Sequence, residues 1–390
     1  MARRTRCAAA RGPVRDAAGH RGARGNAGSG AVGVSAHRPV WRLLANQQDI
    51  TRTIADRLVS IRYTDCAGIE SDVLEIQLSD HDPKNPVRLP PTGAELDFSI
   101  GYDGASVRRV GVFVVDEIEL GAPPAEMTIR ARAAPFDRSR GGKTQLQTQK
   151  RRAWERGKKL GDVVKTIAAE HKLTPVVSPA LAQIELPHLT QTDESDLNFL
   201  SRLAYMYDAV LKPAGGKLVL AKKGEGTTAS GKPQPAITLR PADVTSWRAT
   251  IAKREVSGTV IARWHATKQA KINEVKIGAG EPVTILKRYL QTEAMAQAAA
   301  RAELEKRARR QATLHVQMPG RTDAVAEGRL ILQGFREGAD GTWTVTRAEH
   351  TLDGGGYRTT VDAEWPTATA TAATQKPVEN AAGDAPAPAQ

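Results

Sequence analysis

The chain has 390 residues, more than a single hydrophobic core usually organises, so two or three domains are expected. Its low aromatic content (4%) and 34 glycines favour many short strands and turns over a helical bundle. No apolar run reaches about 18 residues, which argues against a transmembrane helix. Cys7 and Cys66 form no disulfide or metal-binding pattern, and cytoplasmic synthesis is expected.

The net charge of +13 is concentrated in two segments. Residues 1–40 carry eight arginines and one acid, and residues 138–159 carry nine Lys or Arg and one acid. Such segments are usually solvated surface, but they leave open a nucleic-acid-binding protein that uses 1–40 and 138–159. Nucleic-acid platforms usually interleave several aromatics, whereas Trp154 stands alone here. A contact with a protein partner is the better-supported alternative, through the following residues: Lys150, Arg151, Arg152 and Trp154.

Both ends of the chain are expected to be disordered. Residues 1–40 are rich in Arg, Ala and Gly and have no hydrophobic periodicity, so they bury too little apolar area to offset their ordering entropy. We interpret this basic extension as a mis-assigned start, with the true start near Val34 to Trp41. Residues 367–390, rich in Thr, Ala and Pro, form the second predicted disordered tail.

Residues 41–137 alternate apolar and polar side chains, which predicts five or six strands with one buried and one solvated face. The same alternation returns over 236–366, a segment that also contains a predicted helix at 293–310. That helix is rich in Ala and has few large apolar residues, so we expect it to be exposed or to lie on a partner. Each segment is predicted to be an antiparallel β-barrel or sandwich domain.

Residues 138–222 have a different, helical pattern. Apolar residues at three- and four-residue spacing predict one amphipathic helix from Leu160 to His171 and another over 194–207, where Asp193 or Ser195 supplies the cap. A strand, a glycine-bearing turn and a returning strand follow, up to Ala221. This segment is expected to be a small α+β insert, and residues 223–235 a flexible loop.

A faint internal repeat at an offset of 230 links the two β segments. Gly111–Val115 is similar to Gly341–Val345, and the alternating residues from Met127 to Ala133 match those from Tyr357 to Ala363. Such a repeat predicts two β-domains of similar fold on either side of the insert. The predicted fold class is therefore α+β, mainly β: two similar antiparallel β-barrel domains flanking a small α+β insert, with disordered termini.

No residue pattern predicts an enzyme, a cofactor or a metal. Asp80-His81-Asp82 is dense in ligand types, but adjacent residues of an extended chain point to opposite faces, and Pro83 follows. Glu117 and Glu119 share one face of a strand, most simply a solvated one. The sequence contains none of the GxSxG, HExxH or P-loop motifs.

Several stretches resemble the bacteriophage late control gene D family, the hub of the contractile-tail baseplate. They span about residues 40–366 and are Trp41–Thr51, Gly101-Tyr102, Gly111–Ile118, Leu160–Val164, Gln191–Ala204, Gly341–Val345 and Gly356–Thr360. The most specific stretch reads Glu-Ser-Asp-Leu-x-Phe-Leu. Its signature residues are Glu194, Ser195, Asp196, Leu197, Phe199, Leu200 and Leu203.

The resemblance implies a non-enzymatic structural hub of a phage tail or of a prophage-derived injection particle. Three copies would form a ring that adapts the sixfold tail tube to the threefold spike. The implied partners are the spike protein and tail tube or baseplate proteins, with DNA passing through the lumen without specific binding. The implied location is the virion tail baseplate, assembled in the bacterial host cytoplasm without a membrane anchor. A cell-wall hydrolase is a further alternative, which the missing catalytic constellation disfavours.

Overall fold

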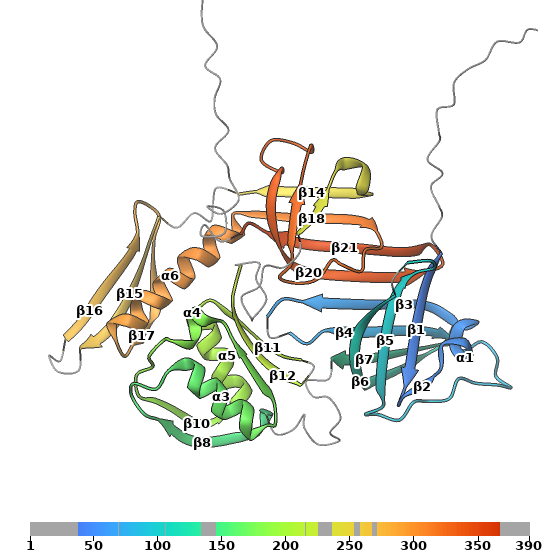
Figure 1. Cartoon of the computed structure of the whole chain (residues 1–390), viewed down its shortest axis with the longest axis horizontal. Helices are drawn as coiled ribbons and strands as arrows, with labels where there is room; N and C mark the ends of the chain where they lie inside the picture. The colour runs from blue at the N-terminus through green and yellow to red at the C-terminus, as the bar shows by residue number, and fades with distance from the viewer. Residues whose placement is uncertain are drawn as a thin grey trace, which may run out of the picture. The chain divides into compact units, whose positions relative to one another are not determined.

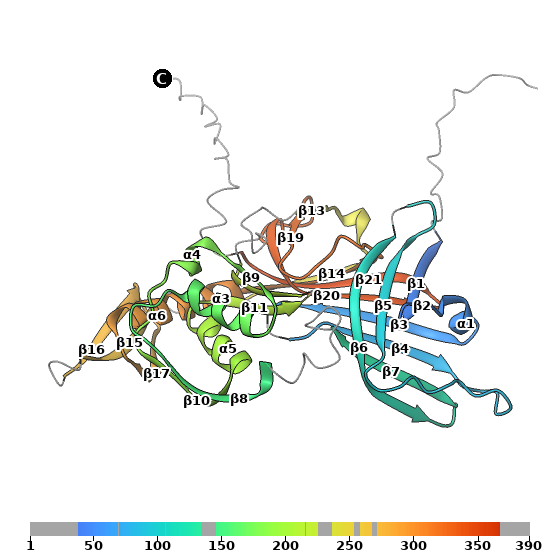
Figure 2. The ribbon, with the colours of Figure 1, turned by 60° about the horizontal axis from the view of Figure 1, so that its bottom comes forward.

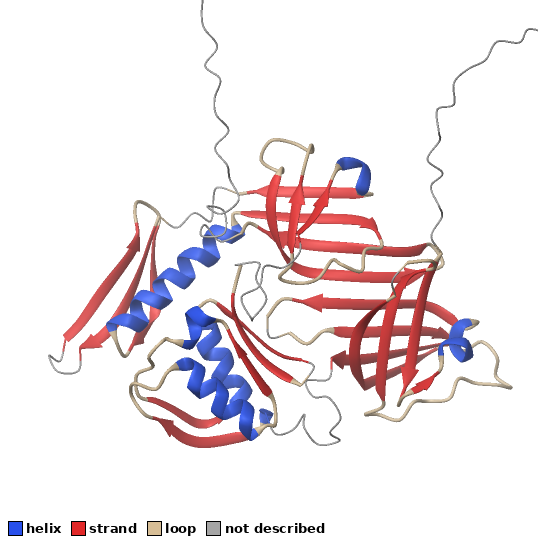
Figure 3. Ribbon diagram, viewed as in Figure 1, coloured by secondary structure: helices blue, strands red, loops and turns tan. Residues whose placement is uncertain are grey.

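The computed structural model describes residues 38–68, 70–105, 107–133, 146–214, 216–224, 236–252, 258–266 and 271–366. Most of them lie in strands, and the longer helices lie in the insert and near residue 300 (Figures 1 and 3). The mainly β, α+β fold class is confirmed. Nearly all of the two predicted disordered termini, and most of the predicted loop, fall outside the described residues. None of the helices in the described ranges is long and apolar enough to cross a membrane.

The first β-domain is built from the strands that the alternating pattern predicts. Its buried residues come from one face of each strand and include Phe98, Phe113 and Met127. The elements are β1 (Pro39–Ala45), β2 (Gln48–Asp49), α1 (Thr51–Ala55), β3 (Leu58–Cys66), β4 (Val73–Ser79), β5 (Glu95–Tyr102), β6 (Arg108–Gly121) and β7 (Glu126–Ala133).

The second β-domain has its own apolar core around Trp343, Leu330 and Val316. Its elements lie in two separate parts of the chain, residues 236–251 and residues 312–364. They are β13 (Ala236–Leu239), a 3-10 turn (Pro241–Asp243), β14 (Ser246–Ile251), β18 (Ala312–Pro319), β19 (Arg329–Leu332), β20 (Gly341–Asp353) and β21 (Gly356–Glu364).

The two β-domains have the same strand order. Neighbouring strands follow β3-β4-β7-β6-β5-β1 in the first domain and β14-β18-β21-β20-β19-β13 in the second. The pairing of β6 with β7 shifts between Val115 and Glu117, and that of β20 with β21 shifts between Val345 and Arg347. These bulges lie 230 residues apart, so β6 and β20 match at the predicted offset.

Two details differ from the predicted repeat. Val115 faces Ala131, whereas Val345 faces Ala363, so β7 and β21 match at an offset of 232 and not 230. The reason is the length of the hairpin: β20 and β21 each extend two residues beyond the counterparts of Gly121 and Glu126, whereas the connection between them is only two residues shorter. In addition, β13 runs parallel to β19 whereas β1 runs antiparallel to β5, so the second domain is not entirely antiparallel.

A single strand contact joins the two β-domains into one sheet. The second half of β20 pairs antiparallel with β3, from Arg347 opposite Cys66 to Asp353 opposite Ser60 (Figures 1 and 2). His350 stacks on Tyr63 across this joint, with ring centroids 5.6 Å apart. Leu352 lies beside Ile61 and belongs to the core of the first domain.

The insert forms a middle domain in which two amphipathic helices meet short sheets. The buried face of α3 (Leu160–Glu170) and that of α5 (Asp196–Met206) follow the predicted three- and four-residue spacing. The remaining elements are β8 (Gln149–Trp154), β9 (Thr174–Val177), α4 (Pro179–Ala182), β10 (Leu189–Ser195), β11 (Ala209–Ala214) and β12 (Lys217–Lys222). β8 pairs with β10, and β12 lies between β9 and β11.

Residues 259–310 do not join the second β-domain, where the sequence placed them. β15 (Thr259–Ala266), β16 (Lys271–Gly278) and β17 (Val283–Leu290) form a separate sheet, against which α6 (Glu293–Arg310) packs. Their buried side chains belong to the core of the middle domain. The predicted exposure of α6 is corrected as well: its alanines are small enough for the helix to lie close to the sheet, and Ala296, Ala299 and Ala300 are buried.

Candidate functional site

The signature segment begins with an irregular strand that leads into α5. β10 pairs with β8 through a shift between Gln191 and Glu194, and Asp193 has a positive φ of 50°. Ser195 then caps α5, because its Oγ accepts a hydrogen bond from the backbone N–H of Asn198 at 3.2 Å. The bulge and the cap together place Asp196 at the first position of the helix, with its side chain fully buried.

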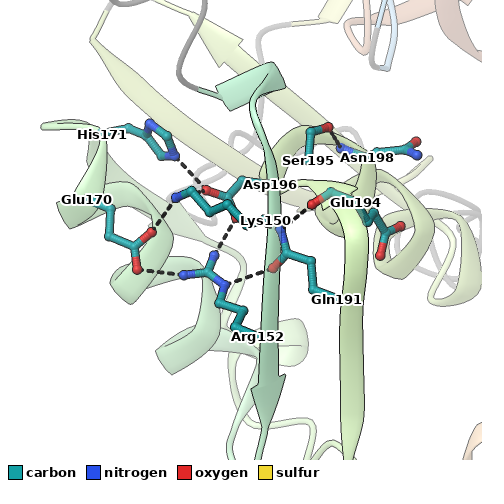
Figure 4. A network of polar contacts seen from close by, with 9 residues as sticks. All are labelled: Lys150, Arg152, Glu170, His171, Gln191, Glu194, Ser195, Asp196 and Asn198. Carbon is teal, nitrogen blue, oxygen red and sulfur yellow. Dashed lines mark hydrogen bonds and ion pairs between the residues drawn. The ribbon is translucent and has the colours of Figure 1, made fainter.

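Asp196 is the centre of a buried ion network (Figure 4). Its Oδ2 atom lies 2.6 Å from Lys150 Nζ and 2.7 Å from His171 Nε2, which donates to it. Its Oδ1 atom accepts from Gln191 Nε2 at 2.9 Å and from the Arg152 guanidinium. A buried carboxylate is stable only when it is paired and hydrogen-bonded in this way.

A second carboxylate completes the network. Glu170, at the end of α3, accepts from Lys150 Nζ at 2.8 Å and from Arg152 at 2.6 Å. Burial by itself would raise the pKa of Asp196 and of Glu170, but the hydrogen bonds and charges of Lys150 and Arg152 outweigh burial. Both pKa values are therefore lowered, and both carboxylates are ionised at neutral pH.

Glu170, His171 and Asp196 are the only trio of possible metal ligands that the described part of the chain brings within ligand distance. The Lys150 ammonium and the Arg152 guanidinium already neutralise both carboxylates, which disfavours a metal ion at this place. The network links β8, α3, β10 and α5. Its two carboxylates are neutralised by its two cations, whereas His171 Nδ1 is buried without a hydrogen-bond partner among the described residues. Its chemistry is that of a structural cross-brace.

The other signature residues support the same helix. Phe199, Leu200 and Leu203 are buried in the core of the middle domain, and Leu197 is half-buried against it. Glu194 forms an ion pair with Arg202, with an N–O distance of 2.8 Å. The sequence-predicted signature therefore marks how α5 is held in place.

All four basic-segment residues make contacts inside the chain. Lys150 and Arg152 belong to the Asp196 network, and Trp154 is buried, stacked on Phe199 with ring centroids 5.8 Å apart. Arg152 also lies over the Trp154 ring at 4.4 Å. Arg151 has a largely exposed side chain, but it is paired with Asp193 at 2.6 Å. The three basic side chains of residues 150–152 thus form ion pairs with acidic residues of the middle domain itself.

Sequence reasoning missed an ion cluster that ties the middle domain to the first β-domain. Lys212, on β11, lies 2.9 Å from Asp65 and 2.8 Å from Asp72. Burial and the neighbouring Asp65 charge raise the pKa of Asp72 to about 6, although Lys212 opposes the shift. Lys212 lies 147 positions after Asp65 and 140 positions after Asp72, and no local pattern links it to either one.

A second missed cluster ties α6 to its surroundings. The Arg309 guanidinium is buried, donates to both carboxylate oxygens of Asp208 at 2.6 and 2.7 Å, and reaches Glu364 on β21 at 3.1 Å. Bidentate pairing of this kind fixes the orientation of the planar group. The last turn of the helix contains Arg307, Arg309 and Arg310, and nothing in the sequence marks Arg309 as the buried one or names its partners.

The chain is similar to proteins of phage tails. A family model described as "Phage tail baseplate hub (GPD)" matches residues 76–355. A probable baseplate hub protein of Escherichia phage 186 is 33% identical over 369 residues, covering 84% of this chain and 92% of that protein. The probable baseplate hub protein of Escherichia phage P2 is also 33% identical, covering 84% and 93%.

A solved structure shows the same fold. The 43 kDa tail protein of prophage MuSo2 from Shewanella oneidensis superimposes with a TM-score of 0.63, at 12% identity, over 84% of this chain and 98% of that one. The matches support the predicted structural hub and give no support to the nucleic-acid-binding alternative. On the extent of the family match and the identity to its relatives, the chain belongs to the phage tail baseplate hub family.

Proposed function

We propose that three copies of this chain form a ring in the baseplate and adapt a sixfold tail tube to a threefold spike. The observation that carries the proposal is the shared strand order and bulge of the two β-domains. Each copy contributes two similar units, so three copies present six around one axis on the tube side. On the spike side the ring keeps its threefold symmetry, because the middle domain occurs once per copy.

As a member of this family, the protein is a structural component of the virion tail. In our proposal it is not an enzyme, because Lys150 and Arg152 already neutralise the two carboxylates of the Asp196 network. Its partners in this proposal are the spike protein, the tail tube or baseplate proteins, and two further copies of itself. DNA would pass through the lumen of the ring without specific binding.

The middle domain acts in this proposal as a rigid spacer. The Asp196 network fixes α5 against β8 and α3, and the Lys212 cluster fixes the domain to the first β-domain. Rigid attachment is what a symmetry adaptor needs, because the spacing of the threefold side must be held while the sixfold side docks. The clusters hold that spacing by charge pairing inside each copy.

Light scattering on the full chain over a range of protein concentrations tests the proposal. We expect a species with three times the mass of one chain, 41.9 kDa. The same measurement on the reconstituted complex with the spike protein should give that ring with the spike bound. A dimer, or a chain that stays monomeric both alone and with the spike, would contradict the ring.

A further inference from the structure

Two of the open strand edges in the described part of the β-domains belong to β14 and to the end of β6. The edge strand β14 pairs only with β18 among the described strands, and residues 117–121 of β6 pair only with β7. Both edges expose apolar side chains: 59% of Leu120, 50% of Ile251 and 36% of Trp247 is accessible. Unpaired edges with apolar side chains are surfaces on which another strand docks.

The joint between β20 and β3 shows what such an edge binds. In β20 the residues after the bulge leave β19 and pair with β3. In β6 the residues after the equivalent bulge leave β5, and no described strand pairs with them on that side. β14 is the counterpart of β3. The first domain has the order β3-β4-β7 and the second has the order β14-β18-β21, in which β21 is the counterpart of β7. The two open edges are thus the counterparts of the two strands in the joint.

The register of the missing contact follows from the registers that are present. Since β6 matches β20 at an offset of 230, Glu119 is the counterpart of Glu349. The pairings of β3 with β4 and of β14 with β18 make Thr250 the counterpart of Thr64. In the joint, Glu349 lies directly opposite Thr64.

We propose that residues 117–121 of β6 pair antiparallel with β14 of a second copy of this chain, with Glu119 opposite Thr250. This inference rests on the ring of the proposed function and names the surface by which the ring closes. The contact is head-to-tail, since one copy supplies β6 and the next supplies β14, and repetition of such a contact closes a ring. Each β-domain would then have one neighbour in its own chain, through the β20–β3 joint, and one in another copy, through the β6–β14 pairing.

The side chains on the open edges fit this pairing. In the proposed register Leu120 lies opposite Ala249, as His350 lies opposite Tyr63 in the joint. Ile118 likewise lies opposite Ile251, as Ala348 lies opposite Asp65. His350, Ala348 and Tyr63 are buried there, whereas Leu120 and Ile251 are exposed in the single chain. Pairing would therefore bury the exposed side chains of Leu120 and Ile251.

Cysteine cross-linking of the full chain tests the register. In a background with Cys7 and Cys66 replaced by Ser, the test variant carries Glu119→Cys and Thr250→Cys, both at exposed positions. Facing residues of antiparallel strands have Cα atoms about 5 Å apart, within disulfide range. Mild oxidation should link copies covalently up to the trimer and no further.

Two matched controls use the same background. Thr64→Cys with Glu349→Cys probes the joint and should form a bond within each chain, leaving a monomer on a denaturing gel. Glu119→Cys with Ser246→Cys moves one partner four residues along β14, about 13 Å away, and should give no ladder. A ladder from this shifted pair equal to that of the test pair would overturn the register.

The outcomes separate the strand pairing from the ring. A chain of trimeric mass whose test pair does not cross-link overturns the pairing and leaves the ring standing. A ladder that continues beyond the trimer supports the pairing and overturns the threefold ring, and a monomer without any ladder overturns both. As a second measurement, Ile251→Asp should abolish self-association without changing the melting temperature of the single chain; unchanged association would overturn the proposed surface.

Discussion

The β-domains and the middle domain are stabilised in different ways. Each β-domain has an apolar core, formed around Phe98 and Phe113 in the first and around Trp343 in the second. The middle domain also has an apolar core, but its helices are held at one end by the buried charges of the Asp196 network. The duplicated part thus tolerates different side chains in the same topology, whereas the middle domain, which occurs once, depends on particular ion-pair partners.

The largest effect is expected from a charge in the core of the middle domain. Leu203→Asp places an unpaired carboxylate among buried apolar side chains of α5 and should cost more than about 4 kcal/mol of unfolding free energy. Hydrogen–deuterium exchange should show lost protection over residues 146–222, with the strands of the two β-domains still protected. Wild-type protection of α5 in this variant would refute its assignment as a core helix.

A smaller but still large effect is expected from the network itself. Asp196→Ala leaves the Lys150 ammonium and the Arg152 guanidinium without their buried partner, and loss of one member of such a network costs about 3–5 kcal/mol. Chemical denaturation followed by exchange in α5 measures this cost. Asp193→Ala, which removes only the exposed pair with Arg151, is the control and should leave the stability unchanged. Equal effects of both variants would show that the buried network is not needed.

The third effect concerns the joint of the β-domains and depends on pH. Burial lowers the pKa of His350 to about 4, below its unfolded value of about 6.5. The contribution of neutral His350 to the free energy of unfolding is thus fully present above pH 6.5. It is lost as the pH falls towards 4, by about 3 kcal/mol in total. His350→Gln should remove this acid-induced loss.

The effect of His350 is the difference in unfolding free energy between the wild type and His350→Gln, measured as a function of pH. Asp72 and Glu327 have raised pKa values of about 6 and about 7, caused mainly by burial, so protonation of these groups stabilises the folded chain in acid. Both groups are present in wild type and variant and cancel in the comparison. His188→Gln, at an exposed position, serves as the control, and the same pH dependence in both variants would contradict the assignment.

The local features of the fold could be predicted from the sequence because they depend on neighbouring residues. Alternation marked the strands of both β-domains, three- and four-residue spacing marked α3 and α5, and Ser195 was among the expected caps. The offset of 230 between β6 and β20 was also visible, because Gly111–Val115 and Gly341–Val345 share a first glycine, a central aromatic residue and a final valine.

The long-range features could not be predicted, because periodicity does not show which elements meet. Lys150 and Asp196 lie 46 positions apart, and nothing local to either one names the other. The spacing of β15–β17 is that of any half-buried sheet, so residues 259–310 were assigned to the wrong core. The alanines of α6 indicated exposure by composition, whereas in the fold they allow close packing.

The central claim is that two similar β-domains let three copies present six equivalent units. Cryo-electron microscopy of the assembled ring, reconstructed with threefold symmetry only, tests it most directly. The account predicts that the first and second β-domains alternate around the axis and superimpose after a rotation of about one sixth of a turn. A ring in which one kind of β-domain lies inside and the other outside would contradict the claim.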